Sequence, residues 1–124
     1  MTVLLSIKPE FATKIFDGSK KYEFRKMIFK RYDVKKIVVY ASSPIQRIIG
    51  EFDVEYILCD KLEQLWKKTH KFSGINKNFF DEYFTDKEVA FAIKIGKVRR
   101  YRTYKYLSDY NINFAPQSFI YLTK

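Results

Sequence analysis

The sequence contains few of the residues on which disulfide-stapled, metal-dependent and disordered proteins depend. Cys59 is the only cysteine and His70 the only histidine among 124 residues. These counts exclude an intrachain disulfide and a zinc finger. We expect no metal or other cofactor. Four glycines and three prolines are too few for a disordered chain or a long linker. A nucleophilic Cys59–His70 pair is the alternative, but Cys59 ends an apolar, strand-like run, where a free cysteine is usually a small buried hydrophobic residue.

Long apolar runs are also missing. No run approaches the roughly 18 to 20 residues that a membrane span needs. The N-terminal segment MTVLLSIKPEF lacks the positively charged start of a secretory signal, and its apolar run is too short for one. We therefore expect a cytoplasmic protein without a membrane partner. The length suits one domain over residues 1–124, expected to be a monomer, and a composition that is 47% hydrophobic supplies a core.

The chain carries a formal net charge of +10, and the positive charge is concentrated in two segments. Residues 14–36 hold nine Lys or Arg against three acids, and residues 94–105 hold six basic residues and no acid. If the two segments lie together, they form a surface that attracts phosphates. The alternative is a solvated, lysine-rich surface without a partner.

Hydrophobic periodicity predicts about six strands and two or three helices. The expected strands are 2–7, 20–25, 35–41, 46–58, 88–102 and 118–123. The expected helices are 9–18 and 60–70, and residues 72–84 are expected to form a turn and then a short helix. Pro9 and Gly18 suit the two ends of the first helix, and Asp60 with Glu63 has the spacing of a capping box. The aromatic residues of the last helix are predicted to be core: Phe79, Phe80, Tyr83 and Phe84. Because the strands do not alternate regularly with helices, we expect an α+β fold, a small, mostly antiparallel β-barrel with the helices at its mouth.

The segment FDGSKKYEFRK combines a turn signal with strand-like alternation. Glu23 and Arg25 share one face of the expected strand, whereas Tyr22 and Phe24 point into the core. Lys20 lies where the turn enters the strand. We predict that Lys20, Glu23 and Arg25 converge in one pocket. The alternative is an exposed ion pair between the last two, which would contribute only about 0–1 kcal/mol.

The residues GSKKYEFR follow the pattern Gly-x-Lys-x-x-Glu-x-Arg, and this pattern resembles the signature of the ASCH domain, a member of the PUA-like superfamily. The flanking LLSIKPEFATKIFDG, YASSP, IIGEF and APQSFIYL resemble further parts of that domain. The resemblance therefore covers nearly the whole chain, and it is to stand-alone prokaryotic or phage-type members. It implies a β-barrel with a cleft lined by the motif, and RNA or modified nucleosides and nucleotides as ligands.

One branch of the ASCH family removes the acetyl group from acetylated cytidine with a lysine in this motif, and another is ribonuclease-like. The resemblance places Lys20 at the position of that lysine. The amidohydrolase branch has a threonine nucleophile where this chain has Glu23, and Glu63 is the candidate for its catalytic glutamate. Two hypotheses follow. The first is an RNA- or modified-nucleotide-binding module, which the missing threonine favours. The second is an enzyme, an amidohydrolase or a ribonuclease, with Lys20 and Glu23 catalytic.

Each motif residue has a chemical role in such a cleft. Glu23 can accept a hydrogen bond from a base or a sugar, and Arg25 can bind a phosphate through its planar fork. Lys20 can act as a point charge or, if burial lowers its pKa, as a base. Further candidates for ligand binding, whose alternative role is turn chemistry, are Lys8, Ser42, Ser43, Arg47, Gln117 and Ser118. Candidates for a nucleic-acid surface are Lys97, Arg99, Arg100 and Arg102, with Tyr101 and Tyr104 beside them either to stack on bases or to cover the sheet.

Overall fold

A computed structural model describes residues 1–122 of the chain. Within that range the elements are β1 (Thr2–Ile7), α1 (Pro9–Asp17), β2 (Tyr22–Arg25), β3 (Lys36–Ala41), β4 (Arg47–Lys61), α2 (Leu62–Thr69), the 3-10 turn η1 (His70–Phe72), α3 (Lys77–Tyr83), β5 (Val89–Lys105), the 3-10 turn η2 (Leu107–Tyr110) and β6 (Phe119–Leu122). Each expected strand and helix is present. Residue 123, the last of the expected final strand, lies outside the described residues.

The strands form one mixed sheet in the order β2-β5-β4-β3-β1-β6. β1 pairs with β3 in parallel, and every other neighbouring pair is antiparallel. This confirms the predicted α+β class and the mostly antiparallel pairing. The sheet is open, however, because β2 and β6 stand at opposite edges and no pairing joins them within residues 1–122. The expected closed barrel is therefore not formed.

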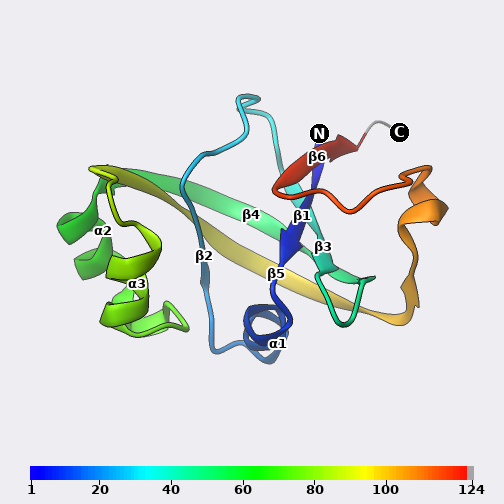
Figure 1. Cartoon of the computed structure of the whole chain (residues 1–124), viewed down its shortest axis with the longest axis horizontal. Coiled ribbons are helices and arrows are strands. Elements are labelled where there is room, and N and C mark those ends of the chain that lie inside the picture. Colours follow the sequence, from blue (N-terminus) through cyan, green and yellow to red (C-terminus); the bar gives the residue numbers. More distant parts are fainter. Residues whose placement is uncertain (123–124) are drawn as a thin grey trace.

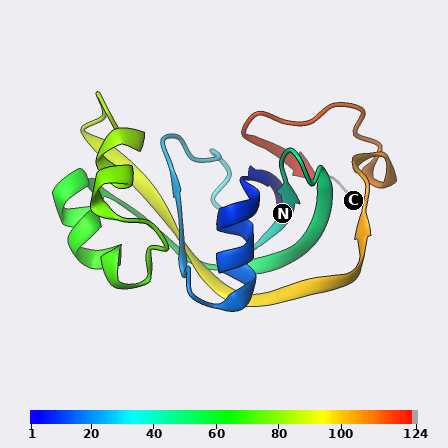
Figure 2. The ribbon, with the colours of Figure 1, turned by 60° about the horizontal axis from the view of Figure 1, so that its bottom comes forward.

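Helices cover the sheet in two places (Figures 1 and 2). α1 buries Ala12 and Ile15 in a large cluster with residues of β1, β3, β4 and β5. α2 and α3 cover the far end of the long β4–β5 ladder, where Leu65 and Phe80 pack on strand residues. Tyr22 and Phe24 of β2 belong to this second cluster; as predicted, they point inward. β2 therefore lies between the two helical parts.

Local sequence explains the helix ends. Pro9 begins α1, and Gly18 ends it in the left-handed conformation (φ 89°), as the sequence predicts. The prediction of an Asp60–Glu63 capping box is wrong. β4 continues to Lys61, and Lys61 precedes α2 without a side-chain cap. Asp60 instead accepts hydrogen bonds from the Lys61 backbone and the Lys68 ammonium, both 2.8 Å long.

The expectation of a buried cysteine is also wrong. Cys59 lies near the end of β4 and is exposed, because the helices cover only one face of this end of the ladder. The His70 ring lies against Trp66, with ring centroids 5.9 Å apart. Among the described residues, no helix is both long and apolar enough to cross a bilayer.

Candidate functional site

The turn after α1 sets the direction of the motif side chains. Asp17 accepts a 2.8 Å hydrogen bond from the Ser19 backbone, and the Lys20 backbone N–H donates to the Lys14 carbonyl (3.0 Å). The Lys21 N–H donates to the Phe72 carbonyl (2.8 Å), which ties the start of β2 to the helical part. This fixed entry directs Lys20 inward.

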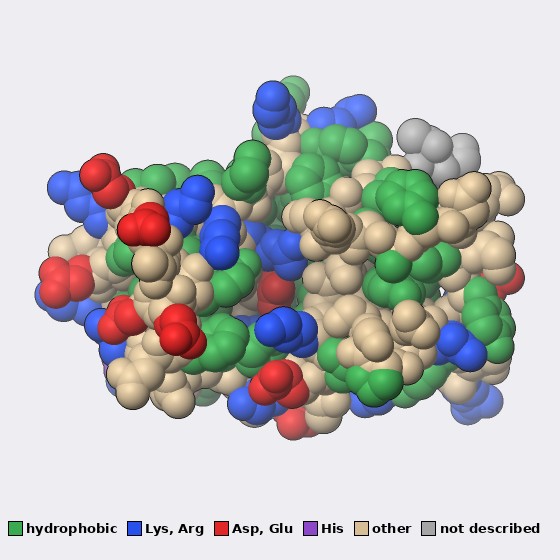
Figure 3. Space-filling model, viewed as in Figure 1, with side chains coloured by type: hydrophobic (Ala, Val, Ile, Leu, Met, Phe, Trp, Pro, Cys, Tyr) green, Lys and Arg blue, Asp and Glu red, His purple; other side chains and the backbone are tan. Residues whose placement is uncertain are grey.

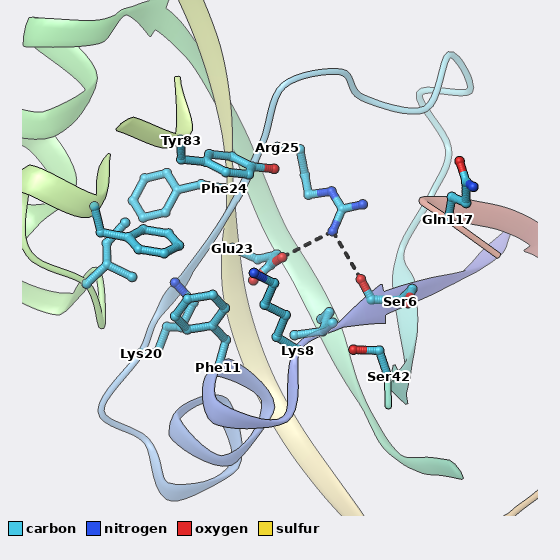
Figure 4. Close-up of a pocket in the computed structure, with 13 residues that line it drawn as sticks. Ser6, Lys8, Phe11, Lys20, Glu23, Phe24, Arg25, Ser42, Tyr83 and Gln117 are labelled. Atoms are coloured by element: carbon cyan, nitrogen blue, oxygen red, sulfur yellow. Dashed lines mark hydrogen bonds and ion pairs between the residues drawn. The ribbon is translucent and has the colours of Figure 1, made fainter. Parts of the chain in front are cut away.

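A pocket of about 300 Å³ lies where α1, β1, β2, α3 and the β3–β4 turn meet (Figure 4). Its volume is at the lower end of the range for small-molecule sites. The three charged motif residues line this one pocket. Its lining residues are Ser6, Ile7, Lys8, Phe11, Lys20, Glu23, Phe24, Arg25, Ser42, Ile75, Phe79, Tyr83 and Gln117.

Glu23 and Arg25 form the polar floor. The Arg25 Nη1 donates to Glu23 Oε2 at 3.2 Å, and the exposed fractions of the two side chains are only 12% and 8%. Arg25 also donates to the Ser6 carbonyl at 3.5 Å and to the Ser118 Oγ at 3.0 Å. This pair is therefore not the exposed ion pair of the alternative interpretation. It is desolvated, and it joins β2 to β1 and to the segment before β6.

Lys20 is almost fully buried, with an exposed fraction of 2%. Its Nζ donates to the Ser73 carbonyl at 2.6 Å and lies 5.3 Å and 5.0 Å from the ring centroids of Phe11 and Phe24. Burial lowers the pKa of the Lys20 ammonium below its ordinary value, and the nearby negative charge of Glu23 opposes part of that change. Lys20 therefore has the environment of a lysine that can release a proton.

Gly74 makes room for the stem of Lys20. It has a φ of +73°, and a Cβ at this position would lie 2.8–2.9 Å from the Cβ, Cγ and Cδ of Lys20. Only glycine satisfies both the backbone conformation and the close contact. Gly74 is a positioning residue that the sequence interpretation missed, because a single loop glycine carries no signal of what packs against it.

An aromatic wall faces the polar floor (Figure 4). Phe79 and Tyr83, four residues apart on α3, stack with an interplanar angle of 11° and a centroid distance of 6.2 Å. Phe11 of α1 meets the edge of Phe79 at 5.3 Å, and burial raises the pKa of Tyr83. The core prediction is correct for Phe80 and Phe84, which are buried. Phe79 and Tyr83, however, line the pocket.

The remaining candidates from the sequence separate into two groups. Lys8, Ser42 and Gln117 line the pocket, and Ser118 reaches it through its hydrogen bond with Arg25. Three others are not part of the lining. Ser43 precedes Pro44 through a cis peptide bond, the Arg47 guanidinium lies 4.2 Å from the ring centroid of Tyr106, and Glu63 is exposed on α2.

The four basic residues proposed for a nucleic-acid surface have different surroundings. Arg99 donates to Glu51 at 2.6 Å and to both carboxylate oxygens of Asp53, and the Tyr101 hydroxyl donates to Glu51 at 2.7 Å. Glu51 and Tyr101 line a second hollow of about 530 Å³. Arg100 lies instead between the rings of Phe16 and Tyr104. The last two, Lys97 and Arg102, are exposed.

Figure 3 shows how charge is distributed on the face viewed in Figure 1. Lys and Arg side chains gather near its centre, and an acidic side chain lies among them. Within residues 1–122, no group of three His, Cys, Asp or Glu side chains is arranged to hold a metal ion. The side chains that line the pocket offer two amines, one of them buried, together with a carboxylate, a guanidinium, three hydroxyls, an amide and aromatic faces.

The chain matches the family model of the ASCH domain over residues 5–99, a span that contains the whole motif and α3. It therefore belongs to the ASCH domain family. The crystal structure of ASCH from Zymomonas mobilis has a similar fold. Its TM-score is 0.91 at 28% identity, and the match covers 99% of this chain and 88% of that one.

The chain is similar to three curated relatives that differ in length. It is 35% identical over 122 residues to ATP synthase subunit alpha and 33% identical over 121 residues to large ribosomal subunit protein uL22, both of Ureaplasma parvum. These matches cover 98% of this chain but only 15% and 39% of the relatives. The chain is also 30% identical over 124 residues to an ASCH domain-containing ribonuclease of Zymomonas mobilis, a match that covers 98% of this chain and 84% of the relative.

Proposed function

We propose that the chain binds RNA by taking one unstacked nucleotide, plain or modified, into the pocket between Glu23–Arg25 and the aromatic wall. The observation that carries the proposal is the opposition of a flat apolar wall to a desolvated charged floor within one small pocket. Proteins that recognise single-stranded RNA use this combination, because an unstacked base offers a face for stacking and an edge for hydrogen bonding.

The aromatic wall would hold the face of the base. Phe79 and Tyr83 present nearly parallel rings, and Lys26 Nζ lies 4.7 Å from the Tyr83 centroid. Stacking of a base on such a wall contributes about 1–3 kcal/mol of binding free energy, and every type of base can stack in this way. The wall therefore supplies affinity without strong sequence preference.

The charged floor would read the edge of the base. Glu23 accepts from an amino or imino group, and the Arg25 Nη2 side donates to a carbonyl or to a phosphate oxygen. Lys8 is exposed at the rim and can neutralise a phosphate outside the pocket. Because Ser6 and Ser118 orient Arg25 and Arg25 in turn holds Glu23, little ordering is needed when the ligand binds.

The test is fluorescence anisotropy with a labelled single-stranded RNA. Replacing Phe79 by Ala should weaken binding by roughly five- to 150-fold, as the loss of one stacking contact predicts. Glu23→Gln, which preserves shape, should remove about 1.5–3 kcal/mol of binding. Phe114→Ala is the matched control, because that ring is 63% exposed and lies outside the pocket. Equal affinities for all four proteins would refute the proposal.

A second candidate function is RNA cleavage, with Lys20 as the general base. The burial that lowers the pKa of Lys20 favours it, and so does the similarity to a protein named as a ribonuclease. Gel analysis of RNA products separates the two functions. A ribonuclease should lose roughly two to four orders of magnitude in turnover in Lys20→Met, while a binding module should yield no products with either protein.

Deacetylation of acetylated cytidine is the less supported enzymatic alternative. Glu23 occupies the position of the threonine nucleophile, and Glu63 lies outside the pocket lining. Release of acetate from acetylated cytidine by the wild type, abolished by Lys20→Met in a folded protein, would establish it against the binding proposal.

A further inference from the structure

Two arginines near the pocket lie beside aromatic rings and have no carboxylate partner among the described residues. The Arg100 guanidinium lies 5.7 Å from the Phe16 centroid and 5.9 Å from that of Tyr104, whose hydroxyl accepts from it at 2.8 Å. The Arg47 guanidinium lies 4.2 Å from the Tyr106 centroid and donates to the Gln46 carbonyl. We call Arg47, Arg100, Tyr104 and Tyr106 the Arg–Tyr strip.

The strip keeps its positive charge. Asp109 lies nearby, but its carboxylate accepts from the backbone N–H of Tyr106, not from either guanidinium. Arg99 shows the opposite arrangement, since Glu51 and Asp53 neutralise it. Arg99 and Arg100, neighbours on β5, therefore differ: the charge of Arg99 is neutralised, whereas Arg100 keeps its charge beside the ring of Tyr104.

The strip lies on the side of the sheet that carries α1. Arg100 contacts Phe16 of this helix, and Phe11, five residues earlier, lines the pocket. Five residues of helix span about 7.5 Å. The β3–β4 turn makes a second connection, because Ser42 lines the pocket and Arg47 follows the turn. In both ribbon views this turn lies between α1 and the C-terminal end of β5 (Figures 1 and 2).

We propose that the Arg–Tyr strip binds the RNA strand that continues from the nucleotide in the pocket, so that the ligand is a single-stranded oligonucleotide and not a free nucleoside. This inference rests on the proposed function and extends it. Guanidinium groups held beside aromatic rings offer N–H donors to phosphates, and exposed tyrosines offer faces to bases, the two contacts by which proteins follow a single strand. The expected path runs from the pocket past α1 and the β3–β4 turn to the end of β5.

The experiment compares two labelled RNA probes, a dinucleotide and a mixed-sequence single strand of about ten nucleotides, a length within the range of single-strand sites. Against the longer probe, the double variant Arg47→Gln and Arg100→Gln should bind on the order of tenfold more weakly. Its slope of log affinity against log salt should be shallower by about 1.4, because two phosphate contacts are lost. Affinity for the dinucleotide should not change.

The control is Lys67→Gln with Lys87→Gln, which removes the same charge from exposed positions at the α2–α3 end. Equal losses in the two double variants, or none in the strip variant, would overturn the inference. Arg100→Lys adds a check that does not depend on net charge, since lysine keeps the charge and loses the planar fork of N–H donors. This variant should weaken binding of the longer probe alone.

The same series separates this inference from the proposed function. If Phe79→Ala leaves binding intact while the strip variant loses it, the pocket proposal fails and the strip stands. If the longer probe binds no more tightly than the dinucleotide, the strip fails and the pocket stands. No binding of either probe by the wild type refutes both.

Discussion

Two ion-pair clusters of similar composition have different environments. The Glu23–Arg25 cluster has side chains 8% and 12% exposed and lies at the bottom of a 300 Å³ pocket. In the other cluster, Arg99 is 33% exposed and bonds two carboxylates, Glu51 and Asp53. The second cluster borders the larger hollow, of about 530 Å³. The smaller pocket therefore holds the more desolvated charge, and this is the feature on which the proposed site rests.

The largest expected difference follows from removing the arginine of each cluster. Arg25→Ala leaves the Glu23 carboxylate buried without its partner, and the free energy of unfolding should fall by about 3 kcal/mol. Arg99→Ala acts at a partly exposed pair, so the loss should be about 1 kcal/mol or less. Urea unfolding of both variants measures this difference. Similar losses would mean that the two clusters do the same structural work.

A smaller effect concerns the glycine that makes room for the buried lysine. Gly74→Ala and Gly18→Ala both place a side chain at positive φ, with values of +73° and +89°, so each should lose about 1 kcal/mol or slightly more to backbone strain. Only Gly74 has the Lys20 stem within 2.9 Å, whereas Gly18 has no atom within 4 Å. Gly74→Ala should therefore lose roughly 1–3 kcal/mol more than Gly18→Ala.

The same pair of variants also reports on binding. Under the proposed function, Gly74→Ala should weaken RNA binding by displacing Lys20 in the pocket, while Gly18→Ala should leave the affinity unchanged. Anisotropy titrations of the two variants supply the measurement. If both bind like the wild type, the position of Lys20 does not matter for the ligand.

The smallest expected effect is a pH dependence of stability. The pKa of Lys20 is lowered in the folded chain from 10.5, so the unfolded chain binds more protons between the two pKa values. Stability of the wild type should therefore rise with pH in that window relative to Lys20→Met, by at most about 1.4 kcal/mol per pH unit. Below the folded pKa the difference should be constant. Stability curves of the two proteins that stay parallel up to pH 10.5 would contradict a buried Lys20 with a lowered pKa.

The sequence predicted those parts of the fold and site that local patterns determine. The alternation of Tyr22, Glu23, Phe24 and Arg25 predicted which side chains point inward, because a strand has a strict period of two. The helix ends at Pro9 and Gly18 followed from backbone preferences. Where two elements compete for the same residues the prediction was wrong: β4 continues through Asp60 and displaces the expected cap.

Long-range packing determined what the sequence could not predict. Phe79 and Phe80 are neighbours of one type on one helix, and only the placement of α3 beside β2 makes one a wall of the pocket and the other core. The barrel was expected because the strands do not alternate regularly with helices and because closure removes exposed edges, but closure depends on which strands form the edges. Likewise, the charge of Arg99 is neutralised by Glu51, far away in sequence.

The contacts that close the pocket join segments that are far apart along the chain. Arg25 bonds Ser118 across 93 residues, and the backbone N–H of Ser6 donates to the Ser118 carbonyl. The α2–α3 end, by contrast, is built largely from neighbouring segments. Because closing long loops is entropically slow, the pocket should be completed after the helical end has folded. A ligand bridging Arg25 and Gln117 then acts mainly on unfolding, lowering its rate while leaving the folding rate nearly unchanged.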